Sequence, residues 1–312
     1  MWHIVKMPKK NRDKNEIKAR SETEIFDRSA VKLHRDRAAG DMADFDFLIL
    51  EVADMVADRL SDIRRSFPVA LDLGCHTGQM AKVLAGRGGI EHLVQCDLSE
   101  KMVRQASGLK FVSDEEFLPI GEAALDLVLS CLSLHWINDL PGALIQLRRA
   151  LKPDGLFLAA FFGGETLKEL RQTLVAAEIE IVGGAGPRVS PFADVKDGGA
   201  LLQRAGFALP VADTDVLTVS YENPLKLLRD LRGMGEQMAT HNRHKTFTKR
   251  KILFRAIEIY QEMFGDSDGR VPATFEVITL TAWSPSTNQQ QPAKRGTGQV
   301  NLADVLNPGD KD

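Results

Sequence analysis

Apolar runs and amphipathic stretches alternate along the middle of the chain. The apolar runs have the length of buried strands, and the stretches between them repeat apolar residues at helical spacing. Strands are predicted at 69–73, 92–96, 109–112, 125–130 and 155–162, and helices at 79–86, 99–106 and 140–151. Strands that alternate with helices in this way form a parallel sheet with right-handed crossovers. We therefore predict an α/β fold with a Rossmann-like, mostly parallel sheet.

One helix is expected before this alternation begins, and one turn within it. The segment 41–65 places five apolar side chains on one face, namely Ile49, Val52, Val56, Leu60 and Ile63. This spacing is typical of an amphipathic helix, which Pro68 would end. The segment 152–155 reads Lys-Pro-Asp-Gly and predicts a turn before the strand at 155–162.

The pattern changes after Gly163 and Gly164. Helices are predicted at 165–182, 196–205, 223–234 and 247–264, and extended segments at 207–221 and 272–283. We expect two late strands, one of them antiparallel, with a helical insertion at about 221–266 that caps the sheet. The chain then divides into a basic helical extension (1–40), one large domain (41–283) and a polar tail (284–312).

Composition narrows the function classes. The 312 residues include 40 Lys and Arg against 43 Asp and Glu, and this balance argues against a general nucleic-acid binder. Three cysteines in a chain of this length fit a reducing compartment. No apolar run approaches the ~20 residues that span a bilayer. Residues 241–255 contain no acid, so they could contact an acidic partner or a membrane surface, or simply form a solvated helix face.

The N-terminal sequence bears on the compartment. Residues 1–37 hold eleven basic and six acidic residues, and a mitochondrial transit peptide would contain few acids. The first residues also lack the apolar core of a secretory signal. We predict a cytoplasmic protein in a bacterium, or a matrix protein if the source is eukaryotic.

The loop after the first strand carries the strongest functional signal. Residues 71–78 read Leu-Asp-Leu-Gly-Cys-His-Thr-Gly. The spacing fails the dinucleotide fingerprint, which needs Gly-x-Gly-x-x-Gly, and it fails the phosphate-loop pattern, which needs Gly-Lys-Ser/Thr. What remains resembles the S-adenosylmethionine (SAM) loop of class I methyltransferases, except that His76 stands where the middle glycine is usual. A NAD-dependent oxidoreductase is the alternative.

A carboxylate after the second strand strengthens this interpretation. At the carboxyl ends of the strands, the Asp97 carboxylate would accept hydrogen bonds from the ribose hydroxyls. Asp114, Glu115 and Glu116 follow the third strand, and one of these acids could hold the adenine amino group; Asp114 is the one that we choose. The complete set of predicted cofactor residues is Asp72, Gly74, Cys75, His76, Gly78, Asp97, Leu98, Asp114, Glu115 and Ser130.

A histidine and a tryptophan follow the fourth strand. His135 could act as a general base, because its ordinary pKa lies near neutrality. Trp136 could stack on adenine or on the substrate. Alternatively, His135 caps a turn and Trp136 packs in the core. No cluster has the spacing of metal ligands, so we predict no metal site.

Several longer segments resemble one family. They are Phe-Asp-Arg at 26–28, residues 113–119, 133–141, 162–171, 230–235, 268–274 and 292–296. Together they are similar to the mitochondrial complex I assembly factor 5 family and its bacterial relatives. The resemblance implies a class I methyltransferase fold, SAM as cofactor, and hydroxylation of an arginine on a quinone-site subunit of complex I. Malonyl-carrier-protein methyltransferases of biotin synthesis resemble the chain as well.

The residues leave the reaction open. Methyl transfer needs mainly alignment of nucleophile and methyl group, whereas hydroxylation needs dioxygen and electrons whose source no motif names. For an arginine substrate, Glu165 and Glu236 are the candidate guanidinium partners. An acyl carrier protein is the alternative substrate. A non-catalytic assembly factor, which keeps a SAM pocket only for stability, is a third interpretation.

Overall fold

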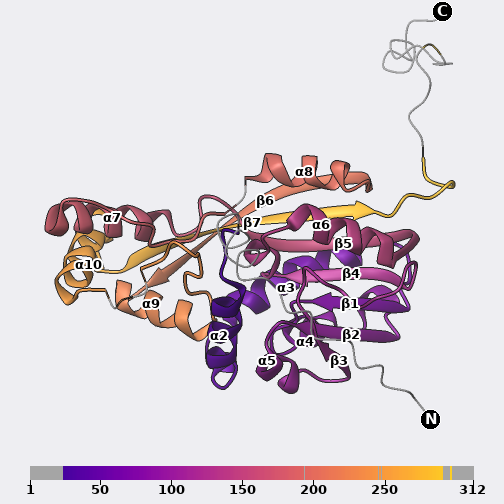
Figure 1. The fold of residues 1–312 in the computed structure, drawn as a ribbon, viewed down its shortest axis with the longest axis horizontal. Helices are drawn as coiled ribbons and strands as arrows, with labels where there is room; N and C mark the ends of the chain where they lie inside the picture. The colour runs from indigo at the N-terminus through magenta and orange to yellow at the C-terminus, as the bar shows by residue number, and fades with distance from the viewer. Residues whose placement is uncertain (1–23, 193, 245, 247, 291–295, 297–312) are drawn as a thin grey trace, which may run out of the picture.

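A seven-stranded sheet forms the centre of the computed structural model, which describes residues 24–192, 194–244, 246, 248–290 and 296 (Figure 1). The strand order is β3-β2-β1-β4-β5-β7-β6. The strands are β1 (Val69–Leu73), β2 (His92–Asp97), β3 (Leu109–Val112), β4 (Leu125–Cys131), β5 (Leu151–Phe162), β6 (Ala208–Tyr221) and β7 (Val271–Trp283). The first five are parallel, while β7 runs antiparallel to both β5 and β6. The predicted α/β fold with one antiparallel late strand is confirmed.

The helices cover both faces of the sheet and one of its ends. They are α2 (Arg28–Ala38), α3 (Phe47–Ser61), α4 (Gln79–Leu84), α5 (Glu100–Gln105), α6 (Leu140–Ala150), α7 (Lys168–Val182), α8 (Val195–Arg204), α9 (Pro224–Gly233) and α10 (Arg250–Phe264). Short 3₁₀ turns lie at Met42–Asp44, Arg87–Gly89 and Leu134–Trp136. Figure 1 shows α7, α9 and α10 gathered at one end of the sheet, with α2 between them and the parallel strands.

Two apolar layers hold the sheet, and β5 shows how the sequence divides between them. Leu156, Leu158 and Phe162 belong to the layer that also contains α3 and α7, whereas Phe157 and Phe161 belong to the layer with α6 and α8. Successive side chains of a strand point to opposite faces. A strand covered on both faces is therefore apolar at every position, which explains the continuous runs in the sequence.

Two local predictions need correction. The helix expected at 41–65 is divided into a 3₁₀ turn and α3, because the chain leaves helical geometry around Asp46, whose carboxylate accepts a hydrogen bond from the Gln79 side chain. The turn expected at 152–155 lies inside β5. There Asp154 takes a positive φ of 63°, and the register with β4 shifts between Leu125 and Leu127. The Pro-Asp-Gly segment is accommodated as an irregularity in the strand.

The insertion between the last two strands contains α9 and α10. Asn223 caps α9 by accepting a hydrogen bond from the Lys226 backbone N–H, and Pro224 starts the helix. Helix α10 packs along α7, and the Arg255–Glu180 ion pair of 2.9 Å links the two. Among the described residues, no helix is long and apolar enough to span a membrane. Residues 1–23 of the predicted basic extension and most of the predicted tail lie outside the described part.

Candidate functional site

The loop between β1 and α4 turns sharply at the carboxyl edge of the sheet. Gly74 and Gly78 have φ values of 72° and 92°, a region that favours glycine. The backbone N–H groups of Gly74 and Cys75 both donate to the Cys96 carbonyl, at 2.8 and 2.9 Å. These bonds fix the loop against β2 and bring it beside Asp97. The loop and the predicted ribose carboxylate are therefore adjacent.

Asp97 and Glu115 are the buried acids of this edge, and both are fully inaccessible. Asp97 accepts hydrogen bonds from the backbone N–H groups of Ser99 (2.8 Å) and His76 (3.2 Å). Glu115 accepts from the Ser133 hydroxyl at 2.8 Å. Burial opposes ionisation of Glu115, but Arg28 and Arg35 outweigh it and lower the pKa to about 2. The edge therefore carries fixed negative charge.

Two arginines that the sequence interpretation missed neutralise this charge. Arg35 donates to Asp97 at 3.1 Å, to Glu115 at 2.9 Å and to the Ser133 hydroxyl at 2.9 Å. Arg28 donates to Asp114 at 2.8 Å, to the Trp136 carbonyl at 3.1 Å and to Glu115. Both arginines belong to α2, outside the sheet. Their spacing of seven residues, which puts them on one helix face, was the available signal.

Asp72 and His76 contain buried polar atoms without a partner among the described residues. Both carboxylate oxygens of Asp72 are of this kind, and burial, then Asp97, raises the pKa of Asp72 to about 8. The His76 Nε2 atom lies 3.1 Å from the Cys131 carbonyl oxygen, and His76 Nδ1 has no partner. Burial, then Arg35, lowers the pKa of His76. The neutral imidazole thus links the loop to the end of β4, in place of the usual glycine.

The other predicted cofactor residues also lie at this edge. Ser130 donates to the Leu73 carbonyl at 2.8 Å and so ties β4 to β1. Cys75 is buried in the loop, Leu98 is half-buried, and Asp114 is partly exposed beside Arg28. Burial raises the pKa of the thiols of Cys75, Cys96 and Cys131, so none is an activated nucleophile.

His135 and Trp136 share a buried carboxylate from a distant segment. Glu236 lies 2.9 Å from His135 Nε2, and the Trp136 indole N–H donates to it at 3.1 Å. A carboxylate only accepts, so the hydrogen of His135 resides on Nε2, and Nδ1 has no partner. Burial opposes ionisation of Glu236, but His135 and Arg35 outweigh it and lower its pKa. Glu236 is therefore ionised at neutral pH.

A cavity of about 620 Å³ opens beside this group, between the sheet and the cap. Trp136 and Glu236 line it together with apolar side chains from β5, from α7 and the segments beside it, and from α9, among them Phe162, Leu167, Leu170, Phe192, Leu228 and Leu231. Glu236 is the one acid among the described lining residues. Glu165, the other predicted guanidinium partner, is not part of this lining. Its side chain is 64% exposed and pairs with Lys168, so its substrate role stays a prediction.

Comparison with known proteins identifies the chain's relatives. A model described as a methyltransferase domain matches residues 71–159, from β1 into β5. The chain is 44% identical to the arginine-hydroxylase NDUFAF5, mitochondrial, of Danio rerio over 292 residues, which cover 91% of this chain and 90% of that protein. The chain belongs to the NDUFAF5 family.

More distant relatives place this NDUFAF5-family chain in the wider class. It is 31% identical to a malonyl-[acyl-carrier protein] O-methyltransferase of a Methylovorus species, over 86% of this chain and 93% of that protein. The YcgJ protein of Bacillus subtilis has the same fold, with a TM-score of 0.52 and 13% identity over 74% of this chain and 98% of YcgJ. The predicted family, the class I methyltransferase fold and the assignment as a SAM-dependent enzyme are confirmed.

The donor set at the strand edge fits SAM. The Asp97 carboxylate suits the ribose hydroxyls, Asp114 suits the adenine amino group, and the unpartnered Asp72 oxygens suit a cationic group. These individual roles stay predictions, while SAM itself is supported by the methyltransferase domain. Within the described residues, no group of three or more His, Cys, Asp or Glu side chains is arranged to hold a metal ion.

Proposed function

We propose that the chain is a SAM-dependent enzyme that modifies an arginine side chain of a protein substrate. The name of its relatives at 44% identity is arginine-hydroxylase, whereas the relatives named as O-methyltransferases of malonyl-acyl-carrier protein are 31% identical. Hydroxylation is accordingly the reaction that we propose, with dioxygen as the oxidant and an external two-electron donor as co-reactant, so that one oxygen atom enters a C–H bond of the arginine and the other leaves as water. Methyl transfer to the same side chain is the second candidate, favoured by the methyltransferase domain at residues 71–159.

The ionised Glu236 beside an apolar cavity is the observation that carries this proposal. The methylene groups of an arginine would pack on Phe162 and Leu231, and the guanidinium would reach the carboxylate. A malonyl group ends in a carboxylate, which the negative charge of Glu236 would repel. Three arginines also line the cavity: Arg188 pairs with Glu178, Arg243 pairs with Asp27, and Arg232 is exposed to solvent, so Glu236 is the buried charge of the lining. Charge therefore favours arginine over an acidic acyl group.

His135 has a defined part in this arrangement. Glu236 holds the hydrogen on Nε2 and orients the ring, while Phe162 and Trp136 pack against it with centroids 5.0 and 5.1 Å away. His135 does not line the cavity and its Nδ1 is buried, so the role of His135 as a general base stays a prediction, while its hydrogen bond fixes the Glu236 carboxylate at the cavity wall. For methyl transfer, the second candidate, SAM bound at the strand edge would supply an activated methyl group on a sulfonium. The chain's own residues bind the side chain, orient it and exclude water.

The substrate that we propose is a quinone-site subunit of respiratory complex I, met in the bacterial cytoplasm or in the mitochondrial matrix. Mass spectrometry of that subunit from a deletion strain tests the proposal. Loss of one oxygen from an arginine, relative to the wild-type strain, is the expected result. Loss of one methylene-sized increment would replace hydroxylation by methyl transfer. An unchanged subunit, together with a change on an acyl carrier protein, would overturn the arginine assignment.

A further inference from the structure

Helix α2 places two arginines of one face on the acids of the cofactor edge. The helix starts at Arg28, capped by Asp27, and Figure 1 shows it between the parallel strands and the cap helix α9. Arg28 and Arg35 are seven residues apart, which is two helical turns, so both point toward the sheet. Glu115 receives both guanidinium groups. The helix is thereby fastened to the groups that the sequence assigns to the cofactor.

Arg35 fills the position beside Asp97 completely. Its side chain is 1% exposed, and the side chains of Asp97 and Glu115 are 0% exposed. Because each of the three side chains has at most 1% of its surface within reach of a water molecule, no water-sized space remains between the guanidinium and the carboxylates. Ser133, the third partner of Arg35, also packs against Gly74 of the β1–α4 loop. An added Cβ at Gly74 would lie 2.1 Å from the Ser133 hydroxyl.

The nucleoside and Arg35 would need the same acceptor. Asp97 Oδ1 accepts from Ser99, and Oδ2 accepts from both His76 and Arg35. Ribose hydroxyls can engage this carboxylate only after the guanidinium has moved. Arg28, at the other end of the helix, also pairs with Glu115, so the buried acids keep one cationic partner after Arg35 has moved.

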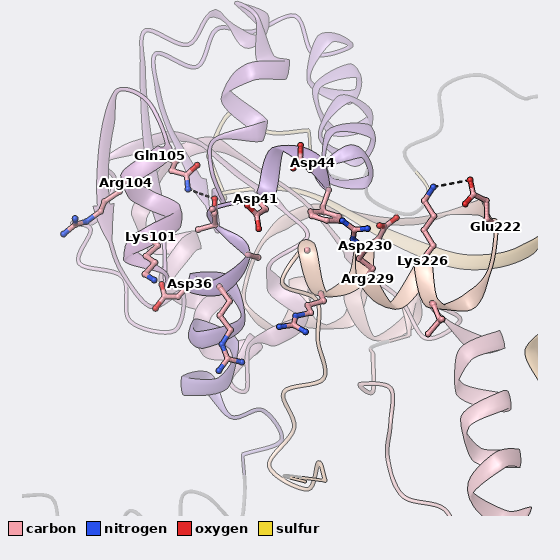
Figure 2. Close-up of a pocket in the computed structure, with 18 of the residues that line it drawn as sticks. Asp36, Asp41, Asp44, Lys101, Arg104, Gln105, Glu222, Lys226, Arg229 and Asp230 are labelled. Carbon is pink, nitrogen blue, oxygen red and sulfur yellow. Dashed lines mark hydrogen bonds and ion pairs between the residues drawn. The ribbon is translucent and has the colours of Figure 1, made fainter. Parts of the chain in front are cut away.

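The helix has space into which it can move. A groove of about 1830 Å³ runs along the outer side of the C-terminal end of α2, between α5 and α9 (Figure 2). Residues 36–40 line it, and the Gln105 side chain crosses to the Ala39 carbonyl at this point. The opposite wall is charged, with Arg229 and Asp230 facing the opening. A shift of this end of the helix would open the strand edge without breaking the sheet.

We propose that Arg35 is the gate of the cofactor site. In the closed form, α2 holds its guanidinium on Asp97, Glu115 and Ser133; the open form releases these groups, moves the end of α2 toward the groove and admits SAM. The apparent affinity for SAM is then reduced by the stability of the closed form. The inference rests on the cofactor role of Asp97 under the proposed function, but it is independent of the substrate and of the reaction.

Calorimetric titration of SAM into Arg35→Ala tests the gate, with Arg37→Ala as the matched control. Arg37 belongs to the same helix, carries the same charge and is exposed. We expect R35A to bind SAM at least tenfold more tightly than the wild type, with faster association in stopped-flow measurements, and R37A to stay within twofold. Equal or weaker binding by R35A would overturn the gate and make Arg35 a residue that supports the bound cofactor.

Hydrogen exchange on the unmodified protein gives a second test that needs no variant. Saturating SAM should speed exchange of the backbone amides of residues 32–38 while it slows exchange in the loop at 74–78. Unchanged or slower exchange in α2 would contradict the proposal even if R35A did not fold. An Asp97→Ala variant tests separately whether Asp97 is a cofactor residue. If this variant binds SAM like the wild type, Asp97 does not bind the cofactor, and the proposed gate is wrong as well.

Discussion

Replacing Gly74 by alanine measures how tightly the cofactor loop is held against the turn after β4. Gly74 has a φ of 72°, and an added Cβ would lie 2.1 Å from Ser133 Oγ and 2.2 Å from Ser133 Cβ. Left-handed backbone costs a residue other than glycine about 1–2 kcal/mol. Forcing extra volume into a packed site costs about 1–3 kcal/mol more. We therefore expect G74A to lose roughly 2–5 kcal/mol of unfolding free energy and to bind SAM more weakly.

A matched glycine separates the two contributions. Gly86 has a φ of 87°, and an added Cβ there would meet no atom within 4 Å. The Gly86→Ala variant should therefore lose only the backbone part, about 1–2 kcal/mol. Combining G74A with Ser133→Gly removes both clashing atoms, and a double-mutant cycle isolates the steric part. Urea unfolding followed by circular dichroism gives all the values. If G74A loses no more unfolding free energy than G86A, or if the coupling energy between positions 74 and 133 is near zero, Gly74 is not tightly packed against Ser133.

Two other predictions follow from the buried acids. Glu236→Gln keeps the shape of the side chain but removes its charge, so we expect a stability loss of about 1–3 kcal/mol, unchanged SAM affinity and lost arginine modification. As a control, Glu122→Gln changes an exposed acid outside the site and should stay within ~0.5 kcal/mol and modify normally. Full activity of E236Q would contradict the substrate assignment. Asp72 has a folded-state pKa of about 8, above its ordinary value, so the folded protein keeps a proton that the unfolded chain has released. Stability should fall between about pH 4 and 8, by up to ~1.4 kcal/mol per pH unit. Asp72→Asn should remove that slope in unfolding titrations, and identical slopes in both proteins would show that Asp72 does not titrate in this range.

The central strands could be predicted closely because β1, β4 and most of β5 are buried apolar runs between breakers. The range expected at 109–112 is β3, and that expected at 69–73 is β1. The predictions were wrong where a contact with a distant residue or a neighbouring strand changes the structure that the local sequence favours. Asp46 interrupts the predicted helix with its bond to Gln79. The turn signal at 152–155 is absorbed into β5, because the pairing with β4 continues on both of its sides, at Leu151 and from Leu156 onward.

In the site as well, residues placed by the sheet could be predicted, whereas contacts between distant segments could not. Asp97 and Glu115 could be placed together because parallel strands end at one edge of a sheet. Arg35 could not, because nothing in the sequence tells that a helix before the domain folds back onto that edge. The contact between His135 and Glu236 joins residues 101 positions apart. The sequence suggested both residues for separate roles, but only the folded chain brings them into contact.

The claim that this chain is a SAM-using enzyme, rather than a passive assembly factor, has one direct test. The chromosomal copy is replaced by Asp97→Ala, and the stability of the purified variant and its loss of SAM binding are verified first. The mass of the quinone-site subunit's arginine peptide is then measured. Our account predicts an unmodified arginine, as in the deletion strain. A fully modified arginine in cells whose only copy cannot bind SAM would contradict it.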